Sequence, residues 1–570
     1  MLKHTNFGFH VLLTLLGAVL FLPFLGDVHL LDWDEINFAE SAREMLVTGN
    51  FWQVQVNYEP FWEKPPLFLW IQAGSMKLFG VNEFAARLPN ALIGIITLNL
   101  LFYLGRKLDQ AAIGKWWAFI YLASFTPQFY FHTGIIDPLF NLWIFLSLYQ
   151  LYRVKEESSM LRWLYAGLFL GLAVLTKGPV AGLVVALVLI VVWAFNRFRF
   201  WFSWLQFGIF TITSLAVASV WFLPELLRNG VGFLSNFLAY QVDLMRNPVA
   251  SHGQPWFYHA VVLLIGCFPA SILALSRFSK SSGSSFEFWM KTMFWVVLIL
   301  FSLVTTKIVH YSSLCYFPLT YLAAVRLHQW RHSQKFTRME AFGLVSLSVF
   351  WLLVFVAVPL FGSYRLELLE RYPNLIKDAF TMENLQAPVD WPLEYVGIAL
   401  SGALVLFWFL NTLLRSKRLD GLKSLLFLGG YFAFYLLIFV PRIEGHTQNS
   451  IIGFYKTIDQ EDCYVDVYKF KSYAHYYYTG VKPLTSSDKL YDVKRDILDS
   501  LGANTRLELN EEGRKEYSNR EMEWYLSGNI DKPVYLVSQP RKRHELEAKK
   551  GFNKVFDQGG YTVFVRKPNN

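Results

Sequence analysis

Charged residues are scarce in this chain. Only 17% of its 570 residues are Asp, Glu, Lys or Arg, whereas 54% are hydrophobic and 18% are aromatic. A soluble core cannot bury that much apolar surface, so the composition excludes a string of soluble domains, although the length alone would allow about three or four. The composition instead predicts a polytopic membrane protein.

Cysteine is equally scarce, with three residues in the whole chain. Cys267 and Cys315 fall in apolar segments, and Cys463 is the only cysteine after residue 441. No disulfide can therefore form within the C-terminal part, and the cysteines do not indicate a redox compartment.

Apolar stretches of about 20 residues recur through most of the chain and predict about thirteen membrane-spanning helices. The stretches are 8–25, 84–104, 114–132, 136–152, 163–177, 178–195, 202–224, 256–276, 289–306, 311–327, 341–361, 391–414 and 422–441. The first has no small-residue cleavage site, so we expect a retained membrane helix rather than a signal peptide. Together they define an expected transmembrane domain over residues 1–441.

Lysine and arginine gather in alternate loops between these stretches. The basic groups are Arg106 with Lys107, Arg153 with Lys155, Arg197 with Arg199, Arg277 with Lys280, Arg331 with Lys335 and Arg338, and Arg415 with Lys417 and Arg418. Basic loops stay in the cytoplasm, so the loops 26–83, 225–255 and 362–390 and the C-terminal part are expected on the opposite side. This asymmetry accounts for the net charge of +9, which therefore gives no reason to expect nucleic-acid binding.

Residues 442–570 differ from the rest, because no stretch there is long enough to span a membrane. Residues 533–538, "PVYLVS", predict a strand, and 541–551 predict a charged helix. A hairpin is expected to follow, with its turn at Gly559 and Gly560. We expect a separate small α/β domain outside the cytoplasm.

Acidic residues cluster directly after the first apolar stretch, in "LDWDEINFAESAREM" (31–45). Asp32 can cap a helix over 33–47, with Glu35 as the second member of a capping box. The mixture of apolar and charged positions predicts that this helix lies on the membrane surface. The helix macrodipole alone can explain an acid such as Asp34 in the first turn, so its position does not by itself indicate catalysis.

A second group lies in "YEPFWEKPPLFLWIQ" (58–72), where Glu63 and Lys64 directly precede two prolines. Proline in the first turn starts a helix, so Lys64 and the exposed backbone amides can together form an anion site. An isolated Glu-Lys pair is usually a solvated surface pair. Here aromatic and aliphatic neighbours indicate a site at the level of the lipid headgroups.

Two later segments place ionisable residues at the same predicted outer boundary. Asp137 lies where the stretch 114–132 returns as the stretch 136–152, and an acid at such a boundary is either functional or the initiator of an Asp-Pro turn. Lys307, His310 and Tyr311 lie between two others, where they are either functional or anchors at the membrane interface.

Five segments carry a resemblance to a known family. They are "LLDWDEINFAESAREMLVTGNF", "YEPFWEKPPLFLWIQAGSMKLFGVNEFAARLPN", "GIIDPLFNLW", "LTKGPVAG" and "TKIVHYSSLCYFPLTYLAAV". In this order they resemble the lipid A aminoarabinose transferases and the wider protein-mannosyltransferase-like group, over residues 8–330. The pair of acids followed by Glu-Lys-Pro is the specific part. From residue 331 onward the resemblance rests on the number of spans and the outer tail.

The resemblance implies a C-type glycosyltransferase architecture and activity. Such an enzyme moves a sugar from a polyprenyl (undecaprenyl) phosphate to an acceptor, here lipid A or a related glycolipid, with inversion. The implied location is the bacterial inner membrane, with the active site and the C-terminal domain on the periplasmic side and the protein a monomer among membrane lipids.

The resemblance also implies roles for individual residues. The catalytic acids are Asp34 and Asp137, and the donor phosphate is bound by Lys64, Arg246, Lys307, His310 and Tyr311. Some members bind zinc through the Glu before the lysine, which carries over to Glu63, with His252 as a second ligand. Two ligands do not define a zinc site, and His259 falls within a predicted span. Trp33 stands where proline is common between the two acids.

Other interpretations stay open. A protein O-glycosyltransferase would use a Ser or Thr hydroxyl as the acceptor. A lipid-linked sugar flippase or transporter belongs to a different class, in which ionisable groups usually lie near mid-membrane and in repeated halves. The chain lacks such a repeat, and its candidate residues gather on one face. A non-catalytic lipid-binding protein with the same fold is a third possibility.

Overall fold

The computed structural model describes residues 2–108, 111–157, 159–246, 253–279, 284–332, 335–415 and 420–568. The chain forms two compact units. The first contains Met1–Leu25, Trp62–Val358 and Glu394–Leu437, and the second contains Gly26–Phe61, Pro359–Leu393 and Ile438–Asn570.

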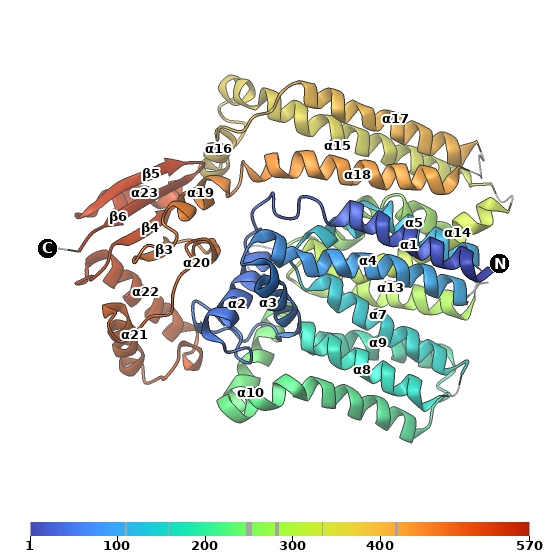
Figure 1. Ribbon diagram of the computed structural model, residues 1–570, viewed down its shortest axis with the longest axis horizontal. Coiled ribbons are helices and arrows are strands. Elements are labelled where there is room, and N and C mark those ends of the chain that lie inside the picture. The colour runs from blue at the N-terminus through green and yellow to red at the C-terminus, as the bar shows by residue number, and fades with distance from the viewer. Residues whose placement is uncertain are drawn as a thin grey trace. The chain divides into compact units, whose positions relative to one another are not determined.

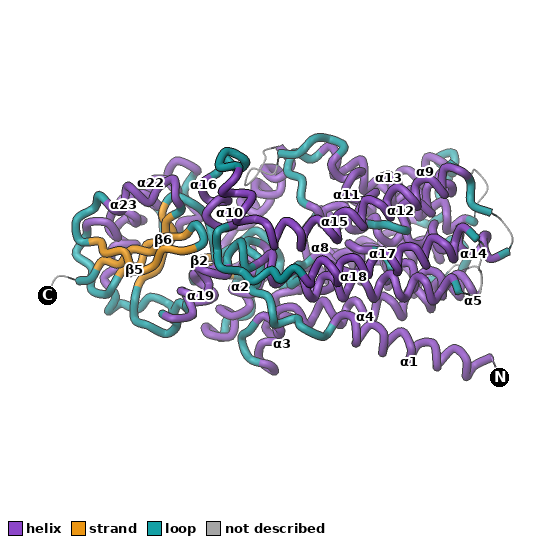
Figure 2. Tube along the Cα trace, turned by 90° about the horizontal axis from the view of Figure 1, so that it is seen from above, coloured by secondary structure: helices purple, strands orange, loops and turns teal. Residues whose placement is uncertain are grey.

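The first unit is built from long apolar helices (Figures 1 and 2). Its elements are α1 (Leu2–Phe21), α3 (Leu67–Phe79), α4 (Glu83–Leu108), α5 (Ala111–Leu122), α6 (Phe125–Phe129), η1 (Tyr130–His132), α7 (Asp137–Val154), α8 (Met160–Lys177), α9 (Val180–Phe195), α10 (Trp204–Arg246), α11 (Tyr258–Gly266), α12 (Ala270–Phe278), α13 (Ser285–Leu303), η3 (Val309–Cys315), α14 (Tyr316–Arg331), α17 (Glu394–Leu414) and most of α15 (Arg338–Arg371) and α18 (Gly421–Glu444). Each apolar stretch predicted from the sequence coincides with one of these helices or with consecutive ones. The predicted helical membrane fold is confirmed.

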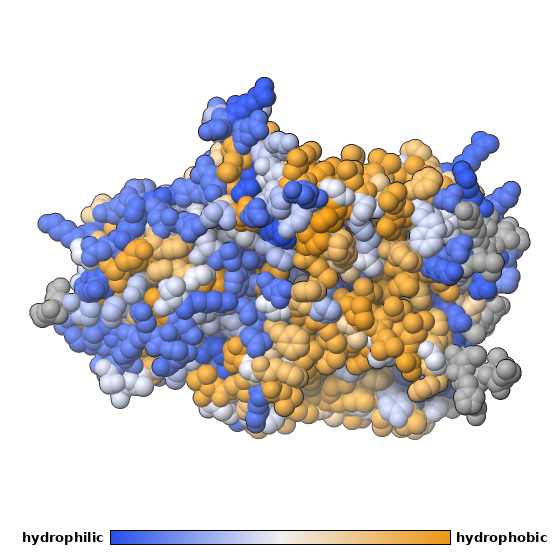
Figure 3. Space-filling model, turned by 45° about the horizontal axis from the view of Figure 1, so that its top comes forward, coloured by the Kyte–Doolittle hydropathy of each residue, from blue (hydrophilic) through white to orange (hydrophobic). Residues whose placement is uncertain are grey.

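Seven helices within the described ranges are long and apolar enough to cross a membrane. Two bent pairs raise this number to nine: α6 and η1 with α7, bent by 120°, and α11 with α12, bent by 117°. Hydrophobic residues cover much of the helical surface seen in Figure 3, as expected for a surface in contact with lipid. The predicted number of about thirteen spans stays a prediction.

Helix α8 packs against both α7 and α10. Gly167 permits the contact with α10, because a Cβ atom at that position would collide with the carbonyl oxygen of Phe210. Close packing of this kind restricts α8 to one position against its neighbours. It thereby fixes the location of Lys177, the last residue of α8.

The second unit contains a four-stranded sheet in the order β3-β4-β6-β5. The strands are β3 (Tyr464–Tyr468), β4 (Val534–Ser538), β5 (Phe552–Gln558) and β6 (Tyr561–Arg566). Strand β3 runs parallel to β4, whereas β6 runs antiparallel to both β4 and β5. Gly559 and Gly560 form the turn of the β5–β6 hairpin and both have positive φ, which glycine adopts without strain. The small α/β fold predicted for this region is confirmed.

Helices and short strands complete the second unit. They are α2 (Asp34–Thr48), β1 (Gln55–Val56), β2 (Glu59–Pro60), α16 (Ala379–Leu385), α19 (Asn449–Thr457), α20 (Ala474–Tyr478), α21 (Lys489–Ser500), η4 (Arg506–Glu508), α22 (Glu511–Ser527) and α23 (Pro540–Glu547). Apolar residues of the sheet, including Val534, Leu536 and Phe564, pack with Leu546 of α23 in a buried core. The unit therefore includes residues 26–61 of the first predicted outer loop and the whole of the predicted loop 362–390, in addition to the C-terminal residues.

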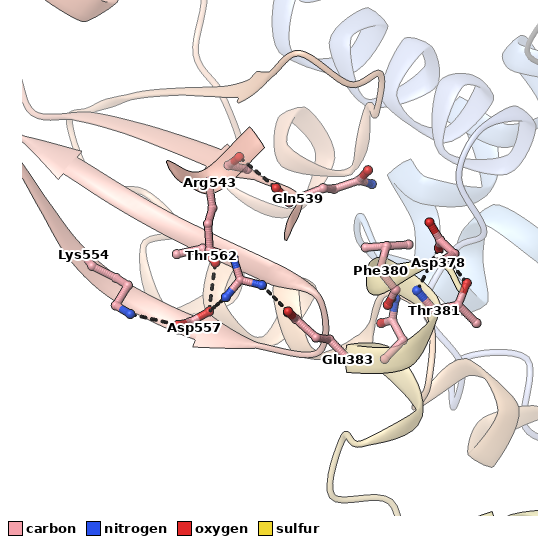
Figure 4. Close-up of polar contacts among 11 residues, drawn as sticks. Asp378, Phe380, Thr381, Glu383, Gln539, Arg543, Lys554, Asp557 and Thr562 are labelled. Carbon is pink, nitrogen blue, oxygen red and sulfur yellow. Dashed lines mark hydrogen bonds and ion pairs between the residues drawn. The ribbon is translucent and has the colours of Figure 1, made fainter. Parts of the chain in front are cut away.

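Helix α16 is attached to the sheet by charged contacts, which Figure 4 shows, and by an aromatic contact. Arg543 of α23 forms ion pairs with Glu383 of α16 and with Asp557 of β5, the latter at 3.4 Å. Phe380 lies edge-on to Tyr561, with ring centroids 5.1 Å apart. The loop that carries α16 is thus an integral part of the second unit.

Helix α2 differs from its prediction in two ways. It begins at Asp34, and no side chain caps it; the Asp32 carboxylate instead accepts hydrogen bonds from the backbone N–H of Tyr473. Residues 35–45 are all buried, so the prediction of a helix lying on the membrane surface is wrong. The charged residues of α2 pair with one another and with the C-terminal residues, which explains how they can be buried.

Candidate active site

The first unit carries a cluster of ionisable side chains at the start of α7. Asp137 is the first residue of this helix, directly after the bend, and only 3% of its surface is exposed. The Nζ atom of Lys177 lies 2.7 Å from Oδ1 of Asp137, and Nε2 of His310 lies 3.7 Å from Oδ2. The structure thus brings together two predicted site residues, Asp137 and His310, from distant parts of the sequence.

Lys177 is a site residue that the sequence analysis missed. Its Nζ lies 4.8 Å from the centroid of the Tyr311 ring and 5.7 Å from that of Phe140. An ammonium group over an aromatic face is stabilised by the ring quadrupole. The signal that could have identified Lys177 is a single charge at the end of an apolar helix, which by default indicates function.

Lys307 precedes the short helix η3, which contains His310 and Tyr311. It is 6% exposed, and its Nζ donates a hydrogen bond to the carbonyl oxygen of Val304 at 2.8 Å. Because η3 follows α13 directly, this turn places the predicted Lys307-His310-Tyr311 group at one end of α13. His310 and Tyr311 reach the Asp137 cluster from there.

The Glu-Lys-Pro motif contacts the second half of α10, beyond the break in that helix at Gly230. Nζ of Lys64 lies 5.0 Å from the centroid of the Tyr240 ring. Nε2 of Gln241 donates a hydrogen bond to the carbonyl oxygen of Glu63 at 3.3 Å. These contacts hold the motif by its backbone and by the lysine. Arg246 ends α10, but its side chain and the whole of His252 lie outside the described residues.

The residues that the structure describes include no group of three His, Cys, Asp or Glu side chains able to hold a metal ion. The proposed ligand Glu63 therefore has no complete ligand set within that part of the chain. His259 of α11 is wholly buried, and among the described residues neither of its ring nitrogens has a hydrogen-bond partner. The zinc site stays a prediction.

Asp34 belongs to the second unit, where it opens α2 and is partly buried. The neighbouring carboxyl of Asp32 is more strongly affected by its surroundings. Burial raises its pKa to about 6, while hydrogen bonds from Ser472 and Tyr473 and the charge of Lys471 act in the opposite direction. Asp32 can therefore gain a proton under mildly acidic conditions.

Further along α2 lies a buried charged group. The guanidinium of Arg43 donates to both carboxylate oxygens of Glu40, at 2.7 and 2.6 Å. Burial and the adjacent Glu40 raise the pKa of Glu44 well above its ordinary range, which favours the protonated carboxyl. The backbone N–H of Tyr58 donates to Glu44 at 2.9 Å. This network gives α2 a fixed polar core.

Comparisons with known proteins agree with the resemblance seen in the sequence. A family model described as dolichyl-phosphate-mannose-protein mannosyltransferase matches residues 63–223. The undecaprenyl phosphate-alpha-4-amino-4-deoxy-L-arabinose arabinosyl transferase of Erwinia tasmaniensis is 29% identical over 338 residues, which cover 57% of this chain and 60% of that relative. A relative of the same name from Pseudomonas fluorescens is 26% identical over 431 residues, 72% of this chain and 70% of its own length.

The solved structure of ArnT from Cupriavidus metallidurans bound to undecaprenyl phosphate superposes on this chain with a TM-score of 0.73. The match covers 99% of both chains at 18% sequence identity. This chain has the ArnT fold. The apo state of the same ArnT gives a TM-score of 0.74 at 17% identity. The predicted resemblance to aminoarabinose transferase-like glycosyltransferases is confirmed.

Proposed function

We propose that the protein is an integral-membrane glycosyltransferase that moves a sugar from a polyprenyl phosphate donor to lipid A or a related glycolipid. The observation that carries the proposal is the buried cluster of Asp137, Lys177 and His310 in a chain with the ArnT fold. The names of the aligned relatives support it. The alignment with the first of these relatives spans 60% of its length. The activity of that relative is therefore attributed to this chain only as a proposal.

The donor phosphate needs cations, because negative charge develops on it as the sugar departs. Lys64, Lys307 and Arg246 are the proposed donor-binding cations, with His310 and Tyr311 beside them. Lys177 adds a further ammonium group, which Asp137 holds at 2.7 Å. Asp137 is proposed to orient this cation toward the departing polyprenyl phosphate.

An apolar cavity of about 900 Å³ supports a lipid donor. Helix α9 lines it with Leu187, Val191 and Phe195, and α13 lines it with side chains that include Trp295, Ile299 and Leu303. Leu303 ends α13, immediately before the turn that carries Lys307. Glu287 and Lys291 line the cavity nearer the start of α13. We propose that the polyprenyl tail occupies the apolar part of this cavity, while its phosphate lies beyond Leu303 near Lys307.

The transfer is proposed as one displacement. The acceptor oxygen forms a bond to the anomeric carbon as the bond between that carbon and the phosphate oxygen breaks, which inverts the configuration. A hydroxyl acceptor gives its proton to the Asp34 carboxylate, which then acts as general base. A phosphate acceptor is already anionic, and Asp34 then serves to position it. The leaving polyprenyl phosphate keeps the bonding electron pair and is stabilised by the cations.

The proposed location is the bacterial inner membrane, with the loops 26–83, 225–255 and 362–390 and the C-terminal residues in the periplasm. The basic groups in the alternate loops support this orientation. The proposed partners are the lipid-linked donor, the acceptor and the surrounding lipids, with the protein acting as a monomer.

A protein O-glycosyltransferase is the second candidate, because the matching family model describes protein mannosyltransferases. Purified protein is given undecaprenyl phosphate carrying a labelled sugar, together with either lipid A or a Ser/Thr-rich peptide. Label on lipid A supports the main proposal, and label on the peptide alone supports the second. Label on neither acceptor, with movement of the donor across vesicles, would instead identify a flippase.

A further inference from the structure

The turn that leads into Asp34 is held by the C-terminal residues of the same unit. Gln448, which precedes α19 and is 8% exposed, donates from Nε2 to the carbonyl oxygen of Leu30 at 2.5 Å. Its Oε1 accepts from the backbone N–H of Asp32 at 3.4 Å. One side-chain amide thus satisfies two backbone groups within three residues, much as a neighbouring strand would.

A second contact fixes the same turn from α20. The hydroxyl of Tyr478, a residue that is 6% exposed, accepts from the backbone N–H of Leu30 at 2.8 Å. Tyr473 adds its backbone N–H, which donates to the Asp32 carboxylate at 3.3 Å. Residues 30–32 are therefore bonded to three separate places in the C-terminal part of the sequence.

The far side of α2 is held in the same manner. The carbonyl oxygen of Val481 accepts from Arg43 at 2.9 Å and from the hydroxyl of Tyr58 at 2.6 Å. Lys494 of α21 bridges Glu59 and Glu521, at 3.2 Å to each. The C-terminal residues thus contact the chain before α2, within α2 at Arg43, and after α2 at Tyr58 and Glu59.

These contacts add to one local contact at the helix start, in which the Glu35 carboxylate accepts from the backbone N–H of Leu31 at 2.8 Å. The residue before α2 makes no side-chain cap, and Asp32 bonds to Tyr473 instead of to the amides of α2. The direction in which the chain enters α2 therefore depends on Gln448 and Tyr478 as well as on Glu35. Because rates fall about 10²-fold when a catalytic group is misplaced by about 1 Å, such contacts bear directly on turnover.

We propose that Gln448 and Tyr478 are positioning residues for Asp34, so that the C-terminal residues form a working part of the glycosyltransferase site. This inference rests on the proposed function, because it takes Asp34 as the group that activates or positions the acceptor. Gln448 and Tyr478 do not contact the reacting atoms. Both act through the backbone of residues 30–32.

The test compares two tyrosines of equal burial in the full-length protein. Tyr478→Phe removes the bond to Leu30, whereas Tyr464→Phe, also at a residue 6% exposed, removes a bond to Asp531 at 3.0 Å within the C-terminal fold. Tyr478→Phe and Gln448→Leu should each lower kcat about 10-fold and leave the Kd for undecaprenyl phosphate unchanged. Tyr464→Phe should leave kcat within about twofold of wild type. Equal kcat in Tyr478→Phe, Gln448→Leu and Tyr464→Phe would overturn the inference.

A double variant separates positioning from general damage. If Gln448 acts through Asp34, then adding Gln448→Leu to Asp34→Asn should lower the residual kcat by less than about twofold. A further 10-fold loss in the double variant would mean that Gln448 acts elsewhere. If Asp34→Asn alone transfers sugar at the wild-type rate, the assignment of Asp34 fails instead, which distinguishes failure of the proposed function from failure of this inference.

Discussion

The ammonium of Lys177 and the carboxylate of Asp137 lie 2.7 Å apart, with the two side chains 15% and 4% exposed. Taking these two charges out of water is costly, and their mutual attraction offsets that cost only while both are present. A buried pair of this kind is therefore more informative about function than about stability, because an apolar pair would serve packing equally well.

Removing one member of this pair should destabilise the protein. Lys177→Met keeps the length of the side chain but leaves Asp137 as an uncompensated buried charge, at an expected cost on the order of 3 kcal/mol. Lys423→Met is the matched control, because Lys423 pairs with Asp420 at 3.7 Å with the two side chains 70% and 41% exposed, and such pairs contribute about 0–1 kcal/mol.

The measurement is the Tm of each purified variant in the same detergent. Lys177→Met should have a clearly lower Tm than wild type, whereas Lys423→Met should match wild type. The double variant Lys177→Met/Asp137→Asn should regain part of the lost Tm, because it removes the buried carboxylate that Lys177→Met leaves without its ammonium partner. Equal Tm values for the two single lysine variants would contradict the buried-pair argument.

Lys64 should affect the donor lipid more than the fold. Lys64→Ala removes a cation that lies over Tyr240, and we expect the Kd for undecaprenyl phosphate to rise at least 10-fold with little change in Tm. Lys64→Arg should restore only part of the affinity, because a planar guanidinium does not place its charge at the same point. Unchanged binding of undecaprenyl phosphate to Lys64→Ala would remove this lysine from the donor site.

The orientation in the membrane can be tested with reporters that function on one side only. A periplasm-dependent reporter fused after Asn570 should be active, and the same reporter fused after Arg199, in a basic loop, should be inactive. Activity in the opposite pattern would reverse the side assigned to every candidate site residue.

Local patterns predicted the elements of this fold well. Runs of about 20 apolar residues are visible without knowledge of the tertiary structure, which explains why all of the predicted stretches coincide with helices. The β5–β6 hairpin was equally predictable, because two adjacent glycines provide the positive φ values that its turn requires.

Contacts between distant residues account for what the sequence could not show. Helix α2 was expected on the membrane surface because it mixes apolar and charged positions, and the sequence does not show that partners elsewhere in the chain bury those charges. The partners include the carbonyl oxygen of Val481, which accepts from Arg43. Lys177 was missed for the same reason, since its pairing with Asp137 depends on how α8 packs against α7.

The raised pKa of Asp32, about 6 against an ordinary value of 3.8, makes stability depend on pH with a definite sign. Between about pH 4 and pH 6 the folded state binds this proton and the unfolded state does not. The stability that protonated Asp32 contributes is therefore complete below about pH 4 and is lost as the pH rises through 6.

Asp32→Asn should abolish the pH-dependent stability that Asp32 contributes. The Tm of the variant minus the Tm of wild type should therefore increase from pH 4 to pH 7. Asp378 provides a control of opposite sign, because hydrogen bonds from the backbone and side chain of Thr381 lower its pKa. Asp378→Asn should therefore be less stable than wild type by a nearly constant amount from pH 4 to pH 7, and this deficit should shrink only below about pH 4, where the Asp378 carboxylate of the wild type gains a proton. If the Tm difference between Asp32→Asn and wild type does not change with pH, the pKa of Asp32 is not raised in the folded protein.

The size of the effect of Asp34→Asn should distinguish the two kinds of acceptor. The substitution preserves the shape of the side chain but removes the charge that a general base requires. With a hydroxyl acceptor, the loss of kcat should exceed the ~10²–10⁴-fold typical of a single acid-base group, because positioning is lost as well. With a phosphate acceptor, the loss should be smaller and should vary less with pH, since no proton has to be removed. The assay is transfer of labelled sugar from undecaprenyl phosphate by wild type, Asp34→Asn and Asp137→Asn between pH 5 and pH 8. Equal turnover by all three proteins would exclude both acids from the mechanism, whereas a loss confined to Asp137→Asn would leave the donor-side cluster as the catalytic group.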